Sequence, residues 1–348
     1  MAAGALLVEV ASVEPAGLVG GRYRLRTLLG RGGMSRVWLA EDEVLRRPVA
    51  IKQVMRSGPV PRKEHAAIRV CALREARAAA RVHHIGAATV YDVVEDAGLV
   101  WIVLEPLSGR TLEQAIAADG PRPVGEVARL GLRLLDVLQA IHASGVVHHD
   151  VKPGNVFLCD DGRVVLTDFG IACTPDDESM VQSDEFVGSP AYVAPERIRG
   201  DDLEPASDLF SLGATLFAAV EGTPPFRTAG SPIATMIAVL EDEPRPLRCT
   251  GRLYSVIGGL LEKDPRRRLK TDAARAALEA VRSRAEDSPR PSPSPTMSSF
   301  RPWRHARERP AQADSPQVNG SPIRNGLHPT DATKQPQSEG ATKHDDHD

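Results

Sequence analysis

Short segments of alternating or β-branched residues recur through the first third of the chain. They cover residues 23–29, 37–40, 49–54, 90–95 and 99–104, and glycine or proline residues separate them. Such a period-two pattern predicts strands that bury one face against a core. Residues 68–82 follow a helical spacing instead and are rich in Ala, Arg and Glu. These patterns predict a small sheet that carries one helix.

The pattern becomes helical after residue 106. Apolar residues recur at helical spacing over 126–145, at Val127, Leu130, Leu134, Leu138 and Ile141. Two short apolar runs at 156–158 and 164–166 flank the turn residues Asp160-Asp161-Gly162, which predicts a hairpin. Four more helical segments are expected at 206–221, 231–242, 252–262 and 271–284. The chain therefore predicts a small sheet lobe, a larger helical lobe and a ligand cleft between them.

The composition changes near residue 286. The remaining residues are rich in proline, and Phe300, Val318, Ile323 and Leu327 are their only Leu, Ile, Val or Phe side chains. So few apolar side chains cannot offset the entropy of ordering, and we expect a disordered tail. The run 288–295, SPRPSPSP, favours extended polyproline II and serves either as a solvated tether or as a docking or phosphoacceptor segment.

Charge and cysteine usage exclude several classes of protein. The formal net charge is −3, which provides no general cationic field for nucleic acid, and we expect no nucleic-acid partner. The four cysteines show no C-x-x-C spacing, which argues against a disulfide scaffold or a zinc ribbon and fits a reducing compartment. No apolar run approaches the length of a transmembrane helix, and the start lacks the basic region of a signal peptide.

A glycine-rich segment, LGRGGMSRV at 29–37, lies between two predicted strands. Small residues there let backbone N–H groups approach a phosphate closely. Taken alone, the pattern is weak evidence, and an ordinary hairpin turn is the better interpretation. A dinucleotide-binding loop is disfavoured because a helix should follow such a loop directly.

A lysine on the next strand, Lys52 in VAIK, is placed to reach the phosphates of a nucleotide. It needs a carboxylate to hold it in place, and Glu75 on the predicted helix is the candidate. Without the other motifs, Lys52 would be an ordinary surface lysine.

The most specific signal is HHDVKPGNV at 148–156, followed by LTDFG at 166–170. Asp150 can accept a hydroxyl proton, and Lys152 can balance the charge of a transferred phosphoryl group. Asn155 and Asp168 supply the hard oxygen ligands that Mg²⁺ requires. The predicted hairpin would bring these two residues to one end.

With these motifs in this order, the sequence resembles the eukaryotic-type protein kinases and, more closely, the bacterial serine/threonine kinases. Further motifs carry the resemblance: VGSPAYVAPE at 187–196, SDLFSLG at 207–213, EGTPPF at 221–226 and KDPRRR at 263–268. It implies an α+β, bilobal protein kinase fold with a small, mainly β N-lobe, one key helix and a larger, mainly α C-lobe. The expected domains are an extension at 1–22, a kinase domain at 23–283 and a disordered Pro/Ser-rich tail at 284–348; within the kinase domain, the N-lobe is 23–104, the hinge 105–107 and the C-lobe 108–283.

The resemblance also implies roles for residues. Asp150 would be the catalytic base, Lys152 would contact the γ-phosphate, and Asn155 and Asp168 would bind the metal. The implied cofactors are ATP and Mg²⁺, with Mn²⁺ as an alternative metal. The implied ATP-binding residues are Leu29, Gly30, Arg31, Gly32, Gly33, Met34, Ser35, Arg36, Val37, Ala50, Lys52, Glu75, Leu104, Glu105, Leu107 and Phe157.

Within that set, Leu104 matches the gatekeeper, and the Glu105 carbonyl and Leu107 N–H would bond the adenine edge. Val37, Ala50 and Phe157 would line the adenine faces. Two structural roles follow from the same resemblance: Glu196 would pair with Arg268, and Asp208 would anchor the catalytic loop.

The sequence departs from the family pattern at three positions. Ser35 replaces the third loop glycine, and Ser189 replaces a threonine. His149 replaces the arginine expected before Asp150, which in related kinases binds a phosphate on the activation segment. A neutral histidine cannot hold a phosphate as a guanidinium does. We therefore expect that phosphorylation of the acidic segment 174–187 is not strictly required for activity.

The expected function is transfer of the ATP γ-phosphate to Ser/Thr hydroxyls of protein substrates, with transient homodimers for autophosphorylation. A pseudokinase scaffold is the alternative, although Lys52, Asp150 and Asp168 are all present. A small-molecule phosphotransferase would lack the Ala194-Pro195-Glu196 motif that ends the activation segment. With no predicted membrane span, the expected location is cytoplasmic.

Overall fold

The computed structural model describes residues 17–31, 35–54, 62–169, 190–201, 204–226, 231–248 and 251–287. Residues 284–287, which were expected to begin the disordered tail, instead end a helix, Thr271–Asp287, and the rest of the predicted tail lies outside the described residues. Both lobes belong to one unit of the chain. No helix in these ranges combines the length and apolarity that crossing a bilayer demands.

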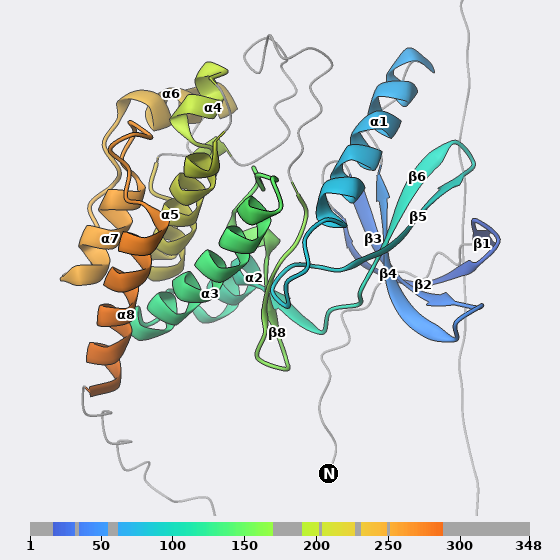
Figure 1. Ribbon diagram of the computed structural model, residues 1–348, viewed down its shortest axis with the longest axis horizontal. Helices are drawn as coiled ribbons and strands as arrows, with labels where there is room; N and C mark the ends of the chain where they lie inside the picture. The colour runs from blue at the N-terminus through green and yellow to red at the C-terminus, as the bar shows by residue number, and fades with distance from the viewer. Residues whose placement is uncertain are drawn as a thin grey trace, which may run out of the picture. The chain divides into compact units, whose positions relative to one another are not determined.

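The sheet lobe is an antiparallel sheet in which all five predicted strands are confirmed (Figure 1). Across the described residues the strand order is β1-β2-β3-β4-β6-β5. An unpredicted strand, β1, pairs with β2, so the sheet begins before the predicted domain start at residue 23. The bounds are β1 Leu18–Val19, β2 Tyr23–Arg31, β3 Ser35–Asp42, β4 Arg47–Val54, β5 Val90–Asp96 and β6 Leu99–Leu104.

The helix α1, Arg62–Ala79, follows the sheet strand β4 and packs against β5 and β6. It begins earlier and ends earlier than the predicted segment 68–82. Its first turn is polar, so apolar spacing could not reveal it, although Pro61 is typical of a helix start. At its end the backbone tightens, since Arg81 and Val82 bond carbonyls three residues back.

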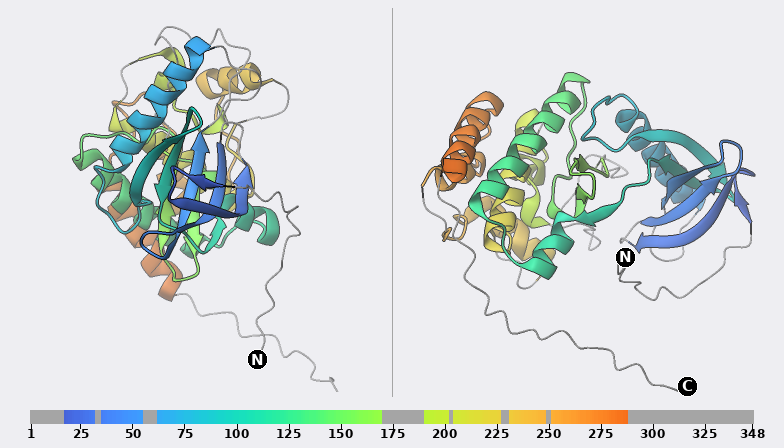
Figure 2. Two further views of the ribbon diagram at one scale, coloured as in Figure 1. Left: turned by 90° about the vertical axis from the view of Figure 1, so that its right-hand side faces the viewer. Right: turned by 90° about the horizontal axis from the view of Figure 1, so that it is seen from below.

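The helical lobe contains all the predicted longer helices and several short elements that the pattern did not reveal (Figures 1 and 2). The longer helices are α3 Val124–Ala143, α5 Pro205–Glu221, α6 Pro232–Glu241, α7 Arg252–Leu260 and α8 Thr271–Asp287. The unpredicted elements are α2 Leu112–Asp119, α4 Pro195–Arg199, β7 Gly109–Thr111 and the 3₁₀ helices η1 Pro153–Asn155 and η2 Pro190–Tyr192.

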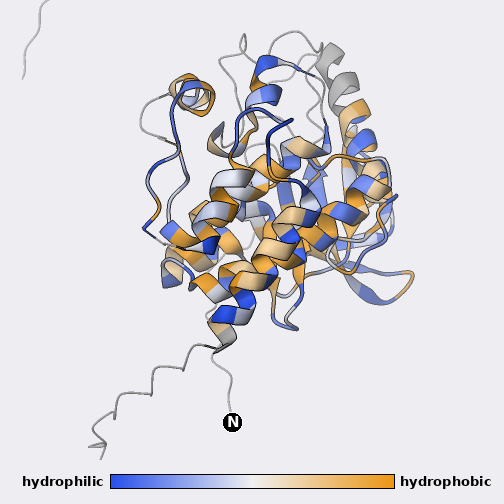
Figure 3. Ribbon diagram, turned by 60° about the vertical axis from the view of Figure 1, so that its left-hand side comes forward, coloured by the Kyte–Doolittle hydropathy of each residue, from blue (hydrophilic) through white to orange (hydrophobic). Residues whose placement is uncertain are grey.

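The core of this lobe lies around α3 and α5. All five apolar residues predicted to form one stripe on α3 are buried. Helix α5 is buried on nearly every side because other elements of the lobe surround it, and hydrophobic residues run along the packed helices in Figure 3. A rigid support of this kind holds the loops at its edge in place.

The predicted hairpin is confirmed as β8, Val156–Cys159, and β9, Val164–Leu166, with Val156 opposite Leu166. Gly162 takes a left-handed conformation in its turn (φ 84°), which glycine adopts without strain. Because the strands are antiparallel, the residues before β8 and after β9 meet at one end. Asn155 and Asp168 lie there, as predicted.

The segment after β6 joins the two lobes, as the view from below in Figure 2 shows. The Glu105 N–H donates to the Thr89 carbonyl at 2.9 Å. The Glu105 carboxylate accepts hydrogen bonds from the Thr89 N–H at 3.1 Å and from Arg163, in the β8–β9 turn, at 3.3 Å. The hinge is thus fixed to both lobes.

The cysteines do not all remain thiols. Cys71 of α1 is disulfide-bonded, which goes against the expected reducing compartment, whereas Cys159 is free.

Candidate active site

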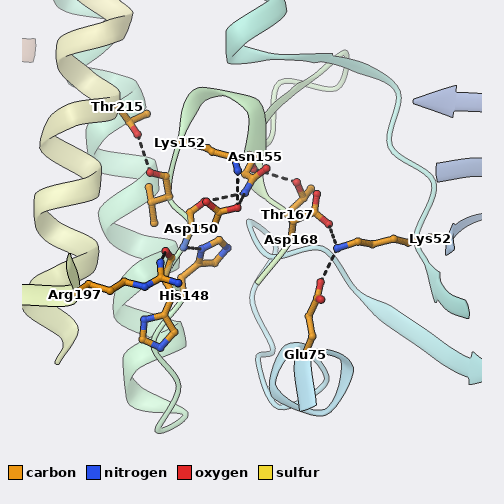
Figure 4. A network of polar contacts seen from close by, with 12 residues as sticks. Lys52, Glu75, His148, Asp150, Lys152, Asn155, Thr167, Asp168, Arg197 and Thr215 are labelled. Carbon is orange, nitrogen blue, oxygen red and sulfur yellow. Dashed lines mark hydrogen bonds and ion pairs between the residues drawn. The ribbon is translucent and has the colours of Figure 1, made fainter. Parts of the chain in front are cut away.

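The centre of the site is Lys52, whose ammonium lies between two carboxylates (Figure 4). Its Nζ donates to Glu75 Oε1 and to Asp168 Oδ1, at 2.7 Å in each case. Strand β4 carries Lys52, helix α1 carries Glu75, and Asp168 follows β9. One side chain therefore links the sheet, its helix and the helical lobe, and the predicted Lys52–Glu75 ion pair is present.

Burial and charge act against each other in this group. Burial would lower the pKa of Lys52, but Asp168 and Glu75 outweigh it and raise the pKa above its ordinary value. Burial raises the pKa of Glu75. It would also raise the pKa of Asp168, but the attraction of Lys52 holds that pKa below its usual range. Lys52 therefore remains a cation and Asp168 an anion at neutral pH.

The loop after α3 holds a second polar cluster. Asp150 Oδ2 accepts a hydrogen bond from Lys152 Nζ and another from Asn155 Nδ2, both at 2.7 Å. Asn155 Nδ2 also donates to the Asp150 carbonyl at 2.8 Å. These contacts use one oxygen of the Asp150 carboxylate and leave its other oxygen, Oδ1, without a hydrogen bond in the described residues.

This loop is anchored from below by Asp208 of α5, as predicted. The Asp208 carboxylate accepts the N–H groups of His148 and His149, both at 2.8 Å, and a contact from His142 Nε2 at 2.8 Å. Burial alone would raise the pKa of Asp208, but these hydrogen bonds hold it below its usual value. The carboxylate stays ionised and fixes the backbone just before Asp150.

The two clusters meet at Thr167, between β9 and Asp168. Its N–H and its hydroxyl donate to the Asn155 carbonyl at 2.9 and 3.2 Å. Phe169 is buried in the core of the helical lobe and packs on the His148 ring, with the ring centroids 4.8 Å apart. Asp168 is therefore held on both sides.

A hollow opens behind Leu104, and four predicted residues line it: Lys52, Glu75, Leu104 and Asp168. The pairing register of β3, β4 and β6 explains why Lys52 and Leu104 lie on the same side of the sheet. Lys52 is opposite Val37, and Ala50 is opposite Leu104, so these side chains share one face of the sheet.

The other predicted nucleotide contacts do not line this hollow. Leu29, Gly30 and Arg31 lie on β2, Ser35, Arg36 and Val37 on β3, Ala50 on β4, Phe157 on β8, and Glu105 and Leu107 in the hinge. The predicted residues Gly32, Gly33 and Met34 lie outside the described residues.

The predicted Glu196–Arg268 pair is present and is bidentate. Arg268 Nη1 lies 2.6 Å from Glu196 Oε1, and Nη2 lies 2.9 Å from Oε2. Both side chains are almost fully buried, and the Ser207 hydroxyl also donates to the Glu196 carboxylate.

Sequence reasoning missed four residues that hold the site together: His142, Thr167, Thr215 and Arg197. The Thr215 hydroxyl donates to the Val151 carbonyl at 3.3 Å, and the Arg197 guanidinium donates to the His149 carbonyl. The helical spacing of α3 and α5 could have placed His142 and Thr215 near the loop. Nothing in the spacing pointed to Arg197 or Thr167.

A sheet lobe and a helical lobe joined by one hinge, with a lysine held between two carboxylates where the lobes meet, define the class of bilobal kinase folds. The family model for the protein kinase domain matches residues 23–280, and the chain belongs to this family.

Named relatives agree with this assignment. A serine/threonine-protein kinase of Corynebacterium efficiens is 36% identical over 275 residues, which cover 76% of this chain and 52% of the relative. The serine/threonine-protein kinase PknA of Mycobacterium tuberculosis is 34% identical, covering 79% of this chain and 64% of the relative. The serine/threonine-protein kinase PknB of Mycobacterium leprae is 36% identical, and the match covers 75% of this chain and 43% of the relative. The matches therefore span about half to two thirds of the first two relatives and less of the third.

Proposed function

We propose that this chain is a serine/threonine protein kinase that transfers the γ-phosphate of ATP to serine or threonine hydroxyls of proteins. The observation that carries the proposal is the contact of Lys52 with both Glu75 and Asp168, beside the Asp150–Lys152–Asn155 cluster. The names of the similar bacterial proteins support the choice of Ser/Thr substrates.

The nucleotide would lie under the sheet. Val37, Ala50 and Lys52 share the face of the sheet that carries Leu104. In this proposal Val37 and Ala50 contact the adenine from above, Phe157 from below, and Lys52 contacts the phosphates. The Glu105 carbonyl and the Leu107 N–H bond the adenine edge, and the segment 29–37 covers the phosphates.

The residues present fit a divalent metal. Asn155 commits its amide nitrogen to Asp150, which leaves its amide oxygen as a ligand, and Asp168 commits Oδ1 to Lys52, which leaves Oδ2. Mg²⁺ prefers such oxygens and takes few from the protein. No group of three or more His, Cys, Asp or Glu ligands occurs in the described part of the chain. A bound Mg²⁺, or Mn²⁺, would neutralise the charge of the triphosphate.

The protein's part in catalysis is positioning. Asp150 Oδ1 would accept the hydrogen bond of the substrate hydroxyl and orient it toward the γ-phosphate. Lys152, held at 2.7 Å from Asp150 Oδ2, would place its charge beside the transferred group. The proton of the hydroxyl would pass to Asp150 as the new bond to phosphorus forms and the bond to the ADP oxygen breaks.

Several parts of the proposal concern the whole protein. The kinase domain is proposed to span 23–283, with protein substrates that carry Ser or Thr acceptors and a transient homodimer for autophosphorylation. No observation favours a scaffold without catalysis, since the lysine and both aspartates are present and in contact as described. The cytoplasmic location and the lack of nucleic-acid partners stay predictions.

Transfer of labelled γ-phosphate from ATP/Mg²⁺ to a generic basic protein tests the proposal, with Asp150→Asn and Asp168→Asn as matched acid-to-amide variants. Because Asp150 orients the acceptor, Asp150→Asn should lower turnover by about 10²–10⁴-fold and still bind Mg-ADP. Asp168→Asn removes a metal ligand and should weaken Mg-ADP binding itself.

Calorimetric titration with Mg-ADP separates the two effects. No transfer by the wild type, with nucleotide still bound, would favour a scaffold, whereas transfer to metabolites alone would favour a small-molecule phosphotransferase.

A further inference from the structure

Arg197 is a partly buried cation that the proposed chemistry does not use. It stands on α4, directly after the Glu196 that pairs with Arg268. Its guanidinium donates to the carbonyl of His149, the residue before Asp150. In the described residues no carboxylate lies within ion-pair distance of Arg197, so it binds the backbone of the catalytic loop rather than an acid.

The residue that Arg197 contacts is strained. His149 has φ of 68°, the left-handed region that side chains rarely adopt. Such a conformation is unfavourable and persists only where its surroundings fix it. The His149 ring does not help, since its Nδ1 is buried and finds no hydrogen-bond partner among the described residues.

The backbone of His149 is instead fixed from both ends. Its N–H donates to Asp208 Oδ1 at 2.8 Å, and its carbonyl accepts from Arg197. The carbonyl of His149 belongs to the peptide bond that leads into Asp150. A rotation of that peptide would move the Asp150 carboxylate away from Lys152 and Asn155.

Arg197 is itself well placed to act as a rigid support. Pro195 occupies the first turn of α4, and the Arg197 N–H donates to the Ala194 carbonyl at 3.1 Å. The preceding Glu196 is fixed by Arg268. Asp150 and Asp208 both attract the Arg197 charge, which offsets part of its burial.

We propose that Arg197 is a positioning residue for the phosphoryl transfer: with Asp208 it clamps the strained His149 peptide and so holds Asp150 in its working orientation. The inference rests on the proposed kinase activity. It requires that Arg197 act through His149, since no hydrogen bond or ion pair in the described residues joins it to Asp150.

The experiment compares Arg197→Met and Arg197→Lys with Arg199→Met, an exposed arginine on the same helix. Arg197→Met should lower kcat by about 10–100-fold, because small misplacements of a catalytic group are costly. The KM for ATP should stay within about twofold, since Arg197 is not in the nucleotide site. Arg197→Lys keeps a hydrogen-bond donor, so its kcat should lie between those of Arg197→Met and the wild type. The kcat of Arg199→Met should match that of the wild type.

A second variant distinguishes the clamp from general destabilisation. Glycine adopts positive φ without strain, so His149→Gly should reduce the need for Arg197. The double variant His149→Gly/Arg197→Met should therefore lose less than about threefold relative to His149→Gly alone, a non-additive result expected of coupled residues. Equal losses in both backgrounds would overturn the proposal.

Hydrogen exchange tests the clamp without any activity. Arg197→Met should speed exchange of the His148 and His149 amides, which donate to Asp208, while Arg199→Met should not. If the wild type transfers no phosphate, the proposed function fails, but faster exchange would still support the clamp. Unchanged exchange in a folded Arg197→Met protein would refute it.

Discussion

At the scale of single residues, two members of the site hold conformations that side chains rarely adopt. His149 and Asp168 have φ of 68° and 57°. Sequence gives no sign of either angle, because His and Asp tolerate positive φ only when their surroundings enforce it. At His149, hydrogen bonds to the N–H and to the carbonyl enforce it. At Asp168, the hydrogen bonds of Thr167 and the burial of Phe169 do so. The identities of Asp150, Asn155 and Asp168 could be predicted from their motifs, but the contacts of Thr167 and Arg197 that support them could not.

The His149 ring gives a prediction for pH dependence. Burial lowers the pKa of His149 from 6.5 to about 4, because it disfavours the cation. Between these two values the unfolded chain binds the proton more tightly than the folded one. Stability should therefore be full above about pH 6.5 and fall as the pH drops toward 4. At about 1.4 kcal/mol per pKa unit, the loss is about 3 kcal/mol at most.

Urea unfolding at pH 7.5 and pH 5.0 checks this for the wild type, His149→Asn and His83→Asn. Replacing His149 should flatten the pH dependence, whereas replacing the exposed His83 should leave it as it is. Burial also lowers the pKa of His148, so some pH dependence of stability should remain in all three proteins. Identical curves for His149→Asn and the wild type would contradict the prediction.

At the scale of elements, the sequence predicts those strands and helices that are long enough for their hydrophobic pattern to repeat. Strand alternation and the stripe on α3 extend over enough residues to show their periods. The elements β1, β7 and α4 are too short for a period, and α2 has only about two turns. They form through contacts with neighbouring elements: β7 pairs with β8, Leu112 and Ala115 of α2 are buried in the lobe, and a capping box at Thr111 starts that helix.

The pair formed by Glu196 of α4 and Arg268 predicts a large loss of stability on one-sided change. Their side chains are 4% and 1% exposed, so removing one partner leaves a buried charge unpaired. Arg268→Met should cost about 3–5 kcal/mol, whereas Glu196→Met/Arg268→Met should recover much of this loss. The neighbouring Arg267→Met, at an exposed side chain, should change stability by less than about 0.5 kcal/mol. Guanidinium unfolding measures all three, and equal stability of the two single variants would refute the prediction.

Two helical glycines predict opposite effects of the same substitution. A Cβ at Gly213 of α5 would lie 2.7 Å from Leu260 Cβ, while at Gly258 of α7 it would meet nothing within 4 Å. Gly213→Ala should destabilise the lobe by about 1–3 kcal/mol through overpacking. Gly258→Ala should stabilise it by about 0.5–1 kcal/mol, because alanine suits a helix interior better. Thermal unfolding distinguishes them, and a Gly213→Ala protein as stable as the wild type would show that α5 and α7 can separate.

At the scale of the whole molecule, the site depends on contacts between distant parts of the chain. The order of motifs was enough to predict that Lys52, Glu75 and Asp168 would come together. It predicted only part of the support beneath them. Asp208 was expected to anchor the loop and does so, but Arg197 reaches the loop through the packing of α4, which no local pattern indicates.

The last prediction concerns control of the whole kinase by its activation segment, residues 174–187, which lies outside the described residues. A phosphate there would need a cation beside Asp150. The residue in that position, His149, is neutral above pH 5 because burial lowers its pKa to about 4, and its carbonyl is already bound by Arg197. The loop is thus fixed by groups of the chain itself.

Replacing Thr174, Ser179 and Ser183 with Ala should therefore leave turnover within about threefold of the wild type, since no phosphate-binding fork is lost. Phosphoryl transfer to a basic protein at saturating ATP measures this, with circular dichroism to confirm folding and Asp150→Asn as the inactive reference. The comparison is sharpest when repeated in a His149→Arg background, where an exposed guanidinium could bind a phosphate and turnover should then depend on the three hydroxyls. Loss of turnover in the wild-type background, with folding intact, would mean that another cation takes the part of the missing arginine.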